Sequence, residues 1–330
     1  MQSTLQNSDL PEVTVIICTR NRAVQLGQVL TSATKMKIPS GLSWEFIVVD
    51  NGSSDNTPDV VKNFEAVLPI RCIREDKPGL SSARNCGVMS ARGKYICWTD
   101  DDVVIHTEWL SSYVEAFRRH PEAAVFGGRV LPLLQPPTPD WFNDRKEYWP
   151  LNALLAHRDF GDDEMEVTFE GGKTPYGANF AVRAKEQKQL KYNLELGVSP
   201  SHKRLGEETD LIYRIFKAGG HGWWVPGSKV SHIIPPKRQT MRYIFDYSVL
   251  AGETYSYLRW KFPTNNYLLA TKERHADYGI TRLEIFKRIF LSGLKFSVRF
   301  VGSDKKSTIF HLRNFGFYLG MASYKPDDKN

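Results

Sequence analysis

The sequence predicts an α/β protein with a mostly parallel sheet covered by helices on both faces. Short runs of β-branched and apolar residues alternate with segments of helical apolar spacing through about the first 100 residues. An order of β-α-β-α-β-α-β implies parallel strands joined by crossover helices. With 330 residues, the chain is long enough for one large domain with appendages or for two ordinary domains.

The first part of the chain contains four expected strands. They are VTVIICT (13–19), WEFIVVD (44–50), IRCIRE (70–75) and YICWTD (95–100). Three helices are expected between them, over 24–36, from about residue 57 with Pro58 in the first turn, and over 80–91.

After residue 130 the alternation stops. A stretch rich in Pro and Trp (130–150) predicts a loop or linker, and residues 163–184 read as two short strands around a Gly-rich turn. A helix is expected from Glu207 to the Gly219-Gly220 pair. From about residue 240 the chain reads as aromatic, basic helices.

The positive charge is concentrated at the C-terminal end. Residues 241–330 hold 15 Lys and Arg against 8 Asp and Glu, whereas residues 1–240 hold 29 of each, so the whole net charge of +7 lies in the last part. Such a surplus suits an anionic surface as partner, or solvated basic helix faces.

The N-terminal segment and the cysteines bear on the compartment. Residues 1–12 have neither a basic start nor an apolar core, and no window approaches the roughly 20 apolar residues of a membrane span. The four cysteines show no metal-ligand spacing and read as reduced thiols. We expect a cytoplasmic protein that could lie at the inner face of the membrane, with no nucleic acid partner.

Three consecutive carboxylates, Asp100, Asp101 and Asp102, follow an apolar strand. In an extended chain Asp100 and Asp102 would project to the same side and could share a cation, although a solvated acidic turn is an alternative. The ends of two other expected strands are also polar, CTRNR (18–22) and VVDNGSSD (48–55). Ligands of open parallel sheets bind at such ends, so the pattern predicts a nucleoside-diphosphate site held by metal and Arg, without a Gly-rich phosphate loop.

Six motifs in order resemble the family 2 glycosyltransferases, which have the A-type nucleotide-sugar transferase fold. They are VTVIICTRNR, VVDNGSSDNT, GLSSARNCGV, YICWTDDDVV, GANFAVR and GEETDLIYRI, spread over about residues 11–235. The resemblance implies transfer of a sugar from a nucleotide-sugar, most commonly a UDP-sugar, to a hydroxyl of a glycan or lipid-linked acceptor with inversion. It also implies a division into an N-terminal tail (1–12), a nucleotide-sugar half (13–130), an acceptor and catalytic half (131–240) and a helical extension (241–330).

The resemblance also assigns residues to the nucleotide and the metal. The nucleotide contacts would be Thr19, Arg20, Asn21, Asp50, Arg84, Asp100 and Asp101. Asp50 would face the base, Asp100 the ribose or metal, and Asp101 is the least defined because it points the other way in a strand. Asp102 would bind a divalent cation together with His232, a ligand pair that suits Mn²⁺ better than Mg²⁺.

The catalytic base implied by the resemblance is Glu208. The family usually has a Glu-Asp pair at the start of a helix, and here the pair reads Glu207-Glu208. On a helical wheel Glu208 shares the face of the apolar Leu211, Ile212 and Ile215, whereas Glu207 is expected on the outer flank. The acceptor side would include Gly177, Ala178, Asn179, Glu207 and Trp224.

Two other classes remain open. A metal-dependent nucleotidyltransferase or phosphotransferase would use a similar carboxylate cluster, usually with two metal ions. A non-catalytic carbohydrate-binding module would not need a base.

The C-terminal segment 282–301 predicts an amphipathic helix that could lie on an anionic membrane or pack its apolar stripe on the domain. The apolar stripe comprises Leu283, Phe286, Phe290, Leu294 and Val298, with Lys287, Arg288, Lys295 and Arg299 elsewhere on the wheel.

Overall fold

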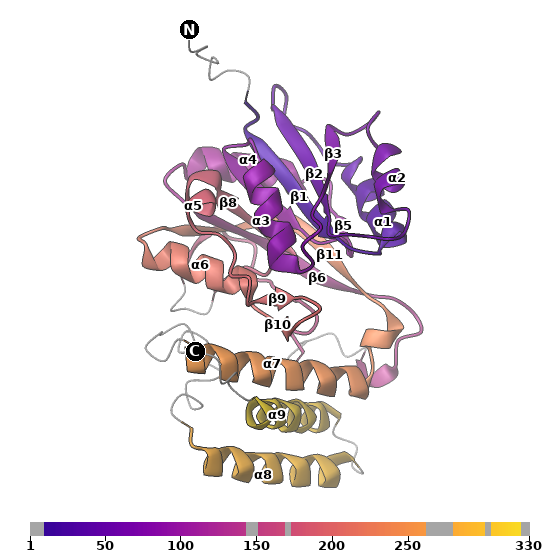
Figure 1. Ribbon diagram of the computed structural model, residues 1–330, viewed down its shortest axis with the longest axis vertical. Coiled ribbons are helices and arrows are strands. Elements are labelled where there is room, and N and C mark those ends of the chain that lie inside the picture. Colours follow the sequence, from indigo (N-terminus) through magenta and orange to yellow (C-terminus); the bar gives the residue numbers. More distant parts are fainter. Residues whose placement is uncertain (1–9, 143–150, 169–172, 262–279, 301–304, 325–330) are drawn as a thin grey trace.

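The computed structural model consists of one large twisted sheet with helices on both faces and a stack of three helices at one end (Figure 1). It describes residues 10–142, 151–168, 173–261, 280–300 and 305–324. Most of the expected N-terminal tail and part of the expected linker lie outside the described residues.

Within the described residues, the main sheet has nine strands. Eight of them follow the order β3-β2-β1-β4-β8-β6-β11-β5, and β7 pairs with β11. The strands are β1 (Val13–Thr19), β2 (Trp44–Asp50), β3 (Ile70–Arg74), β4 (Tyr95–Thr99), β5 (Val103–Ile105), β6 (Val125–Leu134), β7 (Met165–Val167), β8 (Asn179–Arg183) and β11 (Gly222–Ile234). A separate hairpin consists of β9 (Gly197–Val198) and β10 (Lys203–Arg204).

The described helices follow the expected order in the first half and fill the C-terminal part. They are α1 (Ala23–Ala33), α2 (Thr57–Lys62), α3 (Leu80–Ser90), α4 (Trp109–Arg119), α5 (Ala184–Gln189), α6 (Glu207–Lys217), α7 (Met241–Lys261), α8 (Arg282–Phe300) and α9 (Lys305–Ser323), with short 3₁₀ turns at Asp140–Phe142 and Pro236–Arg238.

The expected parallel pairing of the first strands is confirmed, and the second half of the chain adds antiparallel strands to the same sheet. Strands β1 to β4 pair in parallel, but β8 enters antiparallel between β4 and β6. The two strands expected within 163–184 form as β7 and β8, yet they pair with different partners instead of with each other. The expected halves, 13–130 and 131–240, therefore contribute to one continuous sheet, and their functional division stays a prediction.

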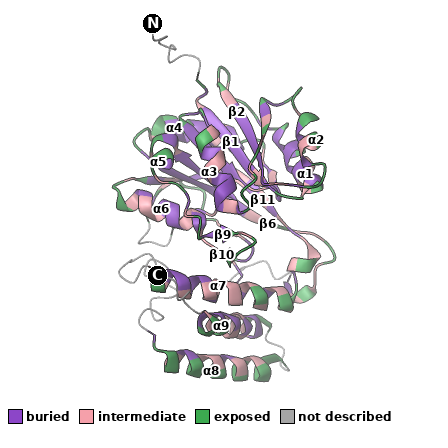
Figure 2. Ribbon diagram, in the orientation of Figure 1, coloured by how far each residue is buried: buried purple, intermediate pink, exposed green. Residues whose placement is uncertain are grey.

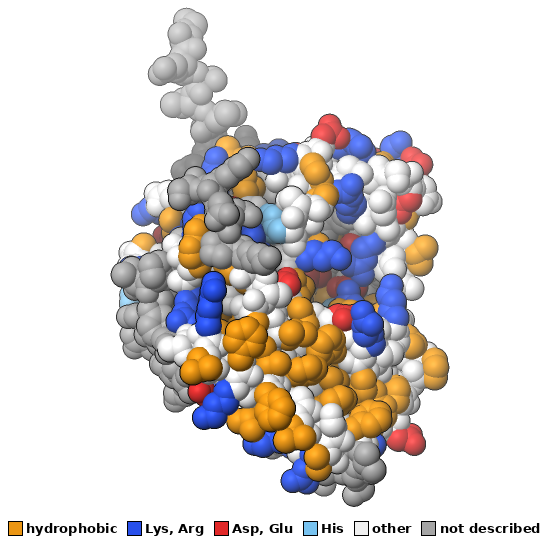
Figure 3. Space-filling view, turned by 60° about the horizontal axis from the view of Figure 1, so that its bottom comes forward, with side chains coloured by type: hydrophobic (Ala, Val, Ile, Leu, Met, Phe, Trp, Pro, Cys, Tyr) orange, Lys and Arg blue, Asp and Glu red, His pale blue; other side chains and the backbone are white. Residues whose placement is uncertain are grey.

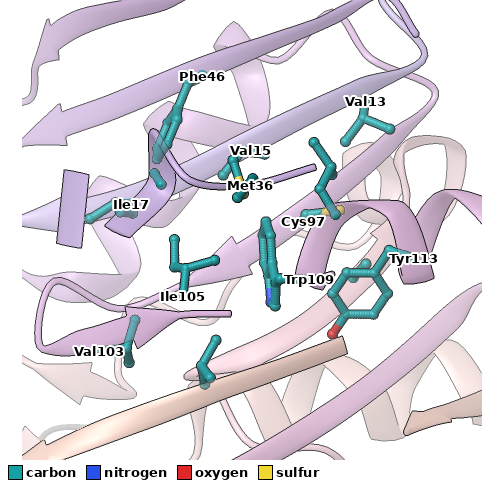
Figure 4. Close-up of a cluster of buried hydrophobic side chains, with 14 of the residues drawn as sticks. Val13, Val15, Ile17, Met36, Phe46, Cys97, Val103, Ile105, Trp109 and Tyr113 are labelled. Carbon is teal, nitrogen blue, oxygen red and sulfur yellow. The ribbon is translucent and has the colours of Figure 1, made fainter. Parts of the chain in front are cut away.

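Alternation along the strands gives the sheet an apolar layer on each face. In β1, Val13, Val15 and Ile17 lie in a cluster that includes α1 and α4, whereas Ile16 lies in the cluster of α3, α5 and α6 on the other face. Figure 4 shows the first of these clusters, with Trp109 among the strand residues. Burial on both faces explains why these strands read as continuous apolar runs.

The C-terminal helices form a stack in which α7 packs on α9, and α9 packs on α8. Close approach of α7 to α9 depends on glycine, because a Cβ at Gly252 or Gly320 would lie 2.0 Å from the carbonyl oxygen of Phe317 or Val249, respectively. None of the described helices combines the length and the apolar character that crossing a bilayer requires.

Asn179, expected at the acceptor, is instead fully buried at the start of β8. Its Oδ1 accepts hydrogen bonds of 2.7 Å from both Trp109 Nε1 and Tyr113 Oη, and its Nδ2 donates to the carbonyls of Arg129 and Ser228 at 2.9 and 3.0 Å. All the bonding capacity of the amide goes to the protein. From this position Asn179 holds α4, β6 and β11 to β8, and the acceptor assignment is wrong.

We expect Asn179→Ala to destabilise the fold by about 3 kcal/mol, because it leaves several buried donors and acceptors unpaired. Chemical denaturation measures the loss. Asn193→Ala, which removes one bond at a partly exposed site, is the matched control and should cost less than about 1 kcal/mol. Equal effects of the two substitutions would contradict the bonding role of Asn179.

Candidate active site

A cleft of about 810 Å³ opens at the carboxyl ends of β1, β2 and β4. The cleft is lined by those strand ends and His232 of β11, by the start of α6, and by Tyr243 and Tyr247 of α7. The lining includes the expected Thr19, Arg20, Arg84, Asp100, Asp101, Asp102, Gly177, Ala178, Glu207, Glu208 and His232. Residues far apart in the sequence thus meet at the sheet edge predicted for a ligand.

The Asp triplet forms a turn between β4 and β5, so the alternation expected of an extended chain does not apply. Asp100 lies 3.5 Å from Arg84 Nη2. Asp101 was expected to point away, but it is buried and lines the cleft. It accepts a 2.7 Å hydrogen bond from the Thr19 hydroxyl and forms a salt bridge with Arg22 at 2.6 Å. Burial raises the pKa of Asp101 to about 7, although Arg22 and Thr19 oppose the shift.

Asp102 and His232 are brought together by backbone pairing. Strand β5 runs antiparallel to β11 with Val103 opposite His232, and the Ile233 N–H donates to the Asp102 carbonyl at 2.8 Å. The Asp102 Oδ1 then lies 3.5 Å from His232 Nε2. The predicted ligand pair is therefore adjacent and buried in the structure.

The tautomer of His232 follows from its other ring nitrogen. The Nδ1 atom lies 2.9 Å from the Leu155 carbonyl, to which it can only donate. In the neutral ring, Nε2 therefore carries the lone pair, beside Arg238 and Asp102, and a ring held through its other nitrogen is the usual arrangement of a metal-binding histidine.

Two arginines that sequence reasoning did not assign also contact Asp102. Arg22 Nη2 and Arg238 Nη1 lie 3.0 and 3.3 Å from its Oδ2, and Arg238 Nη1 is also 3.3 Å from His232 Nε2. Burial acts to raise the pKa of Asp102, but His232 and the two guanidinium groups outweigh it and hold that pKa well below its usual range. Arg22 stands in the quoted CTRNR motif, whereas nothing in the sequence marks Arg238.

Asp102 and His232 fit a divalent cation whose remaining coordination positions are filled by a bound ligand. Within the described part of the chain, no three His, Cys, Asp or Glu side chains converge as a complete metal site. The Asp102 carboxylate and the His232 Nε2 supply two adjacent acceptors, and the approach of Arg238 to both shows that their position attracts positive charge. Two protein ligands suit a cation whose other positions are filled by phosphate oxygens and water.

Glu207 was expected on the outer flank of its helix, and this expectation is wrong. Glu207 is the first residue of α6, is 6% exposed, and lies 3.5 Å from Arg84 Nη1. Burial and the neighbouring Glu208 raise the pKa of Glu207 to about 7, although Arg84 opposes the shift. The helical wheel failed because Arg84, from another segment, packs against Glu207 on a flank that an isolated helix would expose.

Glu208 lines the cleft and is partly exposed. A Cβ at Gly177 would lie 3.4 Å from its carboxyl carbon, so glycine at 177 leaves room beside the carboxylate. The Glu208 side chain makes no hydrogen bond or salt bridge among the described residues. Its carboxylate is therefore accessible in a way that the carboxylate of Glu207 is not.

Arg84 is buried among aromatic side chains. Its guanidinium lies 5.4 to 6.0 Å from the ring centres of Trp98, Phe180 and Tyr192, and its Nη1 has no hydrogen-bond acceptor in the described protein. Its Nη2 and Nη1 lie 3.5 Å from the carboxylates of Asp100 and Glu207, respectively, and the side chain lines the cleft.

The expected base pocket is assembled in part. Thr19 and Arg20 line the cleft together with Asn51, which sequence reasoning missed. Asp50 is buried at the end of β2, where it accepts from the Ser53 N–H at 2.9 Å and from Arg74 at 3.2 Å.

Two other expected contacts lie away from the cleft. Asn21 lines an adjoining smaller cavity, and its Oδ1 accepts from the Ser54 N–H. Trp224 is fully buried against Phe160 and donates from Nε1 to the Gly161 carbonyl, so its assignment to the acceptor is wrong.

The family model for glycosyl transferase family 2 matches residues 14–184, which is just over half of the chain. The chain belongs to this family. The match spans β1 to β8, including the strand ends and the Asp triplet of the cleft.

The similarity of the chain to known proteins agrees with this family assignment. The succinoglycan biosynthesis protein ExoM of Rhizobium meliloti is 26% identical over 247 residues, 73% of each chain. Among solved structures, the S. aureus TarS fragment 1–349 in complex with UDP has a TM-score of 0.51 at 16% identity, over 94% of this chain and 89% of that one. The mannosyltransferase PcManGT of Pyrobaculum calidifontis, in complex with GDP-Man and Mn²⁺, has a TM-score of 0.56 at 16% identity, over 94% and 87%. The A-type fold of this glycosyltransferase is thereby confirmed.

We expect Asp102→Asn to abolish metal-dependent nucleotide binding and to leave the fold intact. In the wild type, UDP or GDP with Mn²⁺ should raise the melting temperature, because a ligand at 100 times its dissociation constant stabilises by about 2.7 kcal/mol. Asp59→Asn, at an exposed carboxylate, is the matched control and should keep the shift. Equal shifts in wild type and Asp102→Asn, unchanged by EDTA, would contradict the assignment.

Proposed function

We propose that this glycosyltransferase moves a sugar from a nucleotide-sugar to an acceptor hydroxyl with inversion, assisted by a divalent cation. The observation that carries the proposal is that the adjacent Asp102–His232 pair and Glu208, from different segments of the chain, line one cleft. Inversion requires attack from the side opposite the departing diphosphate, so the group that binds the diphosphate and the base must face each other.

The donor end of the cleft suits a diphosphate. Asp102 and His232 would hold Mn²⁺ or Mg²⁺, which neutralises charge on a leaving diphosphate when bound. The guanidinium groups of Arg22 and Arg238 add positive charge beside Asp102. Arg84, which lies 3.5 Å from the carboxylates of both Asp100 and Glu207, is a proposed nucleotide contact. Thr19, Arg20 and Asp50 are proposed contacts of ribose and base. Thr19 and Arg20 line the cleft, whereas Asp50 is buried next to Asn51, which does line it.

Glu208 is the proposed base. As the acceptor oxygen bonds to the anomeric carbon, the bond from that carbon to the diphosphate oxygen breaks, and the hydroxyl proton passes to the Glu208 carboxylate. The absence of an ion-pair partner among the described residues leaves both oxygens of Glu208 able to accept that proton. Gly177 and Ala178 line the same part of the cleft and leave room for a sugar.

The relatives support nucleotide-sugar chemistry without fixing the substrates. UDP in TarS and GDP-Man with Mn²⁺ in PcManGT are ligands of those proteins, and ExoM acts in succinoglycan biosynthesis by its name. By analogy we propose a UDP-sugar or GDP-sugar donor and a glycan or lipid-linked acceptor in polysaccharide synthesis.

Product analysis tests the reaction class. Incubation with nucleotide-sugars and mixed acceptors should release free nucleoside diphosphate. Release of pyrophosphate would instead indicate a nucleotidyltransferase, and release of neither product with retained sugar binding would indicate a binding module.

We expect Glu208→Gln to lower turnover by about 10²–10⁴-fold while nucleotide-sugar affinity stays within a few-fold, because the amide keeps the shape but cannot accept the proton. Steady-state kinetics with a titrated donor measures both quantities. Glu115→Gln, at an exposed carboxylate of α4, is the control and should be unaffected. Near-normal activity of Glu208→Gln, with large losses in Glu207→Gln or Asp210→Asn, would mean that the base is another carboxylate of α6.

A further inference from the structure

Helix α8 presents an apolar stripe to solvent along its whole length. The stripe side chains are between 51% and 81% exposed, and they are Leu283, Phe286, Phe290, Leu294 and Val298. At 100° per residue they fall on one side of the helix, whereas the buried Ile285 and Ser292 fall on the opposite side. Helix α8 packs on α9, so the stripe faces away from the protein. The alternative in which the stripe packs on the domain is therefore wrong.

Figure 3 shows hydrophobic side chains gathered over the end of the molecule formed by the C-terminal helices, with Lys and Arg side chains around them. Figure 2 shows α8 at the outer end of the helix stack, with exposed residues along it. A helix of 19 residues is about 28 Å long. An apolar stripe of that length on a surface helix marks an interaction site.

The charge beside the stripe identifies the kind of partner. Helices α8 and α9 carry eight Lys and Arg side chains and one carboxylate, Glu284, and this net charge of +7 equals that of the whole chain. Within the described part of the chain, Lys287, Lys295 and Arg299 are exposed and form no salt bridge. The stripe is therefore bordered by positive charges that are available to an external anion.

We propose that α8 is an interfacial helix that docks the protein on an anionic lipid bilayer, with its axis in the membrane plane. Such a helix buries its apolar side at the boundary of headgroups and acyl chains, and its Lys and Arg side chains contact anionic headgroups. A second copy of the chain fits this surface less well, because pairing two such faces would bring like charges together. The inference does not depend on the proposed reaction, since docking needs neither donor nor acceptor.

Vesicle co-sedimentation of the full chain tests the proposal. The wild type should bind vesicles of phosphatidylcholine mixed with phosphatidylglycerol more than about tenfold tighter than vesicles of phosphatidylcholine alone, given the gain per basic residue near an anionic surface. The difference should disappear at about 1 M salt, where charges are screened beyond about 3 Å.

Three variants separate the contributions. Phe286→Glu with Phe290→Glu should abolish binding, and Lys287→Gln with Lys295→Gln and Arg299→Gln should remove only the preference for anionic vesicles. Val67→Glu with Met89→Glu alters two apolar side chains of similar exposure elsewhere on the surface, and it should bind like the wild type. Unchanged circular dichroism shows that each variant folds, as expected for exposed positions.

Either of two results would overturn the proposal. The first is failure of the wild type to bind anionic vesicles at low salt. If sedimentation velocity then shows a dimer that Phe286→Glu with Phe290→Glu converts to a monomer, the stripe is a dimer interface instead. The second is vesicle binding by that double variant at the wild-type level. Neither result would bear on nucleoside diphosphate release, so failure of the docking proposal is distinguishable from failure of the proposed reaction.

Discussion

The antiparallel pairing of β5 with β11 is the constraint on which the cleft depends. It places Asp102, at the end of a turn, beside His232, at the far end of a long strand, although the two are separated by 130 positions in the chain. The bond from the Ile233 N–H to the Asp102 carbonyl sets this register. A shift of one residue would turn His232 to the other face of the sheet and separate the pair.

The surroundings of Asp102 and the start of α6 have different electrostatic roles in the cleft. Around Asp102, the side chains of His232, Arg22 and Arg238 hold the pKa of the carboxyl well below its usual range, which suits the proposed cation and anionic diphosphate. At the start of α6, the buried Glu207 lies 3.5 Å from Arg84, whereas the Glu208 side chain has no ion pair among the described residues. Two adjacent glutamates can therefore have separate roles, one in holding a buried cation and one in accepting a proton.

The sequence predicted those features that depend on local pattern. Strands β1 and β2 have the expected bounds because apolar β-branched runs between turn residues leave little alternative. The positions of Asn179 and Glu207 were mispredicted because each depends on partners from distant segments, such as Trp109 for Asn179 and Arg84 for Glu207. The short strand β5 carries no periodic signal, and its pairing partner β11 lies more than 100 residues away.

A double-mutant cycle on nucleotide affinity tests most directly whether Asp102 and His232 share one cation. Calorimetric titration of UDP or GDP into the wild type, Asp102→Asn, His232→Gln and the double variant gives a coupling free energy between the two side chains. The account predicts a coupling of about 1.4 kcal/mol or more in Mn²⁺, which is a tenfold effect, and none in EDTA. Coupling that is the same in Mn²⁺ and EDTA, or absent in both, would contradict it.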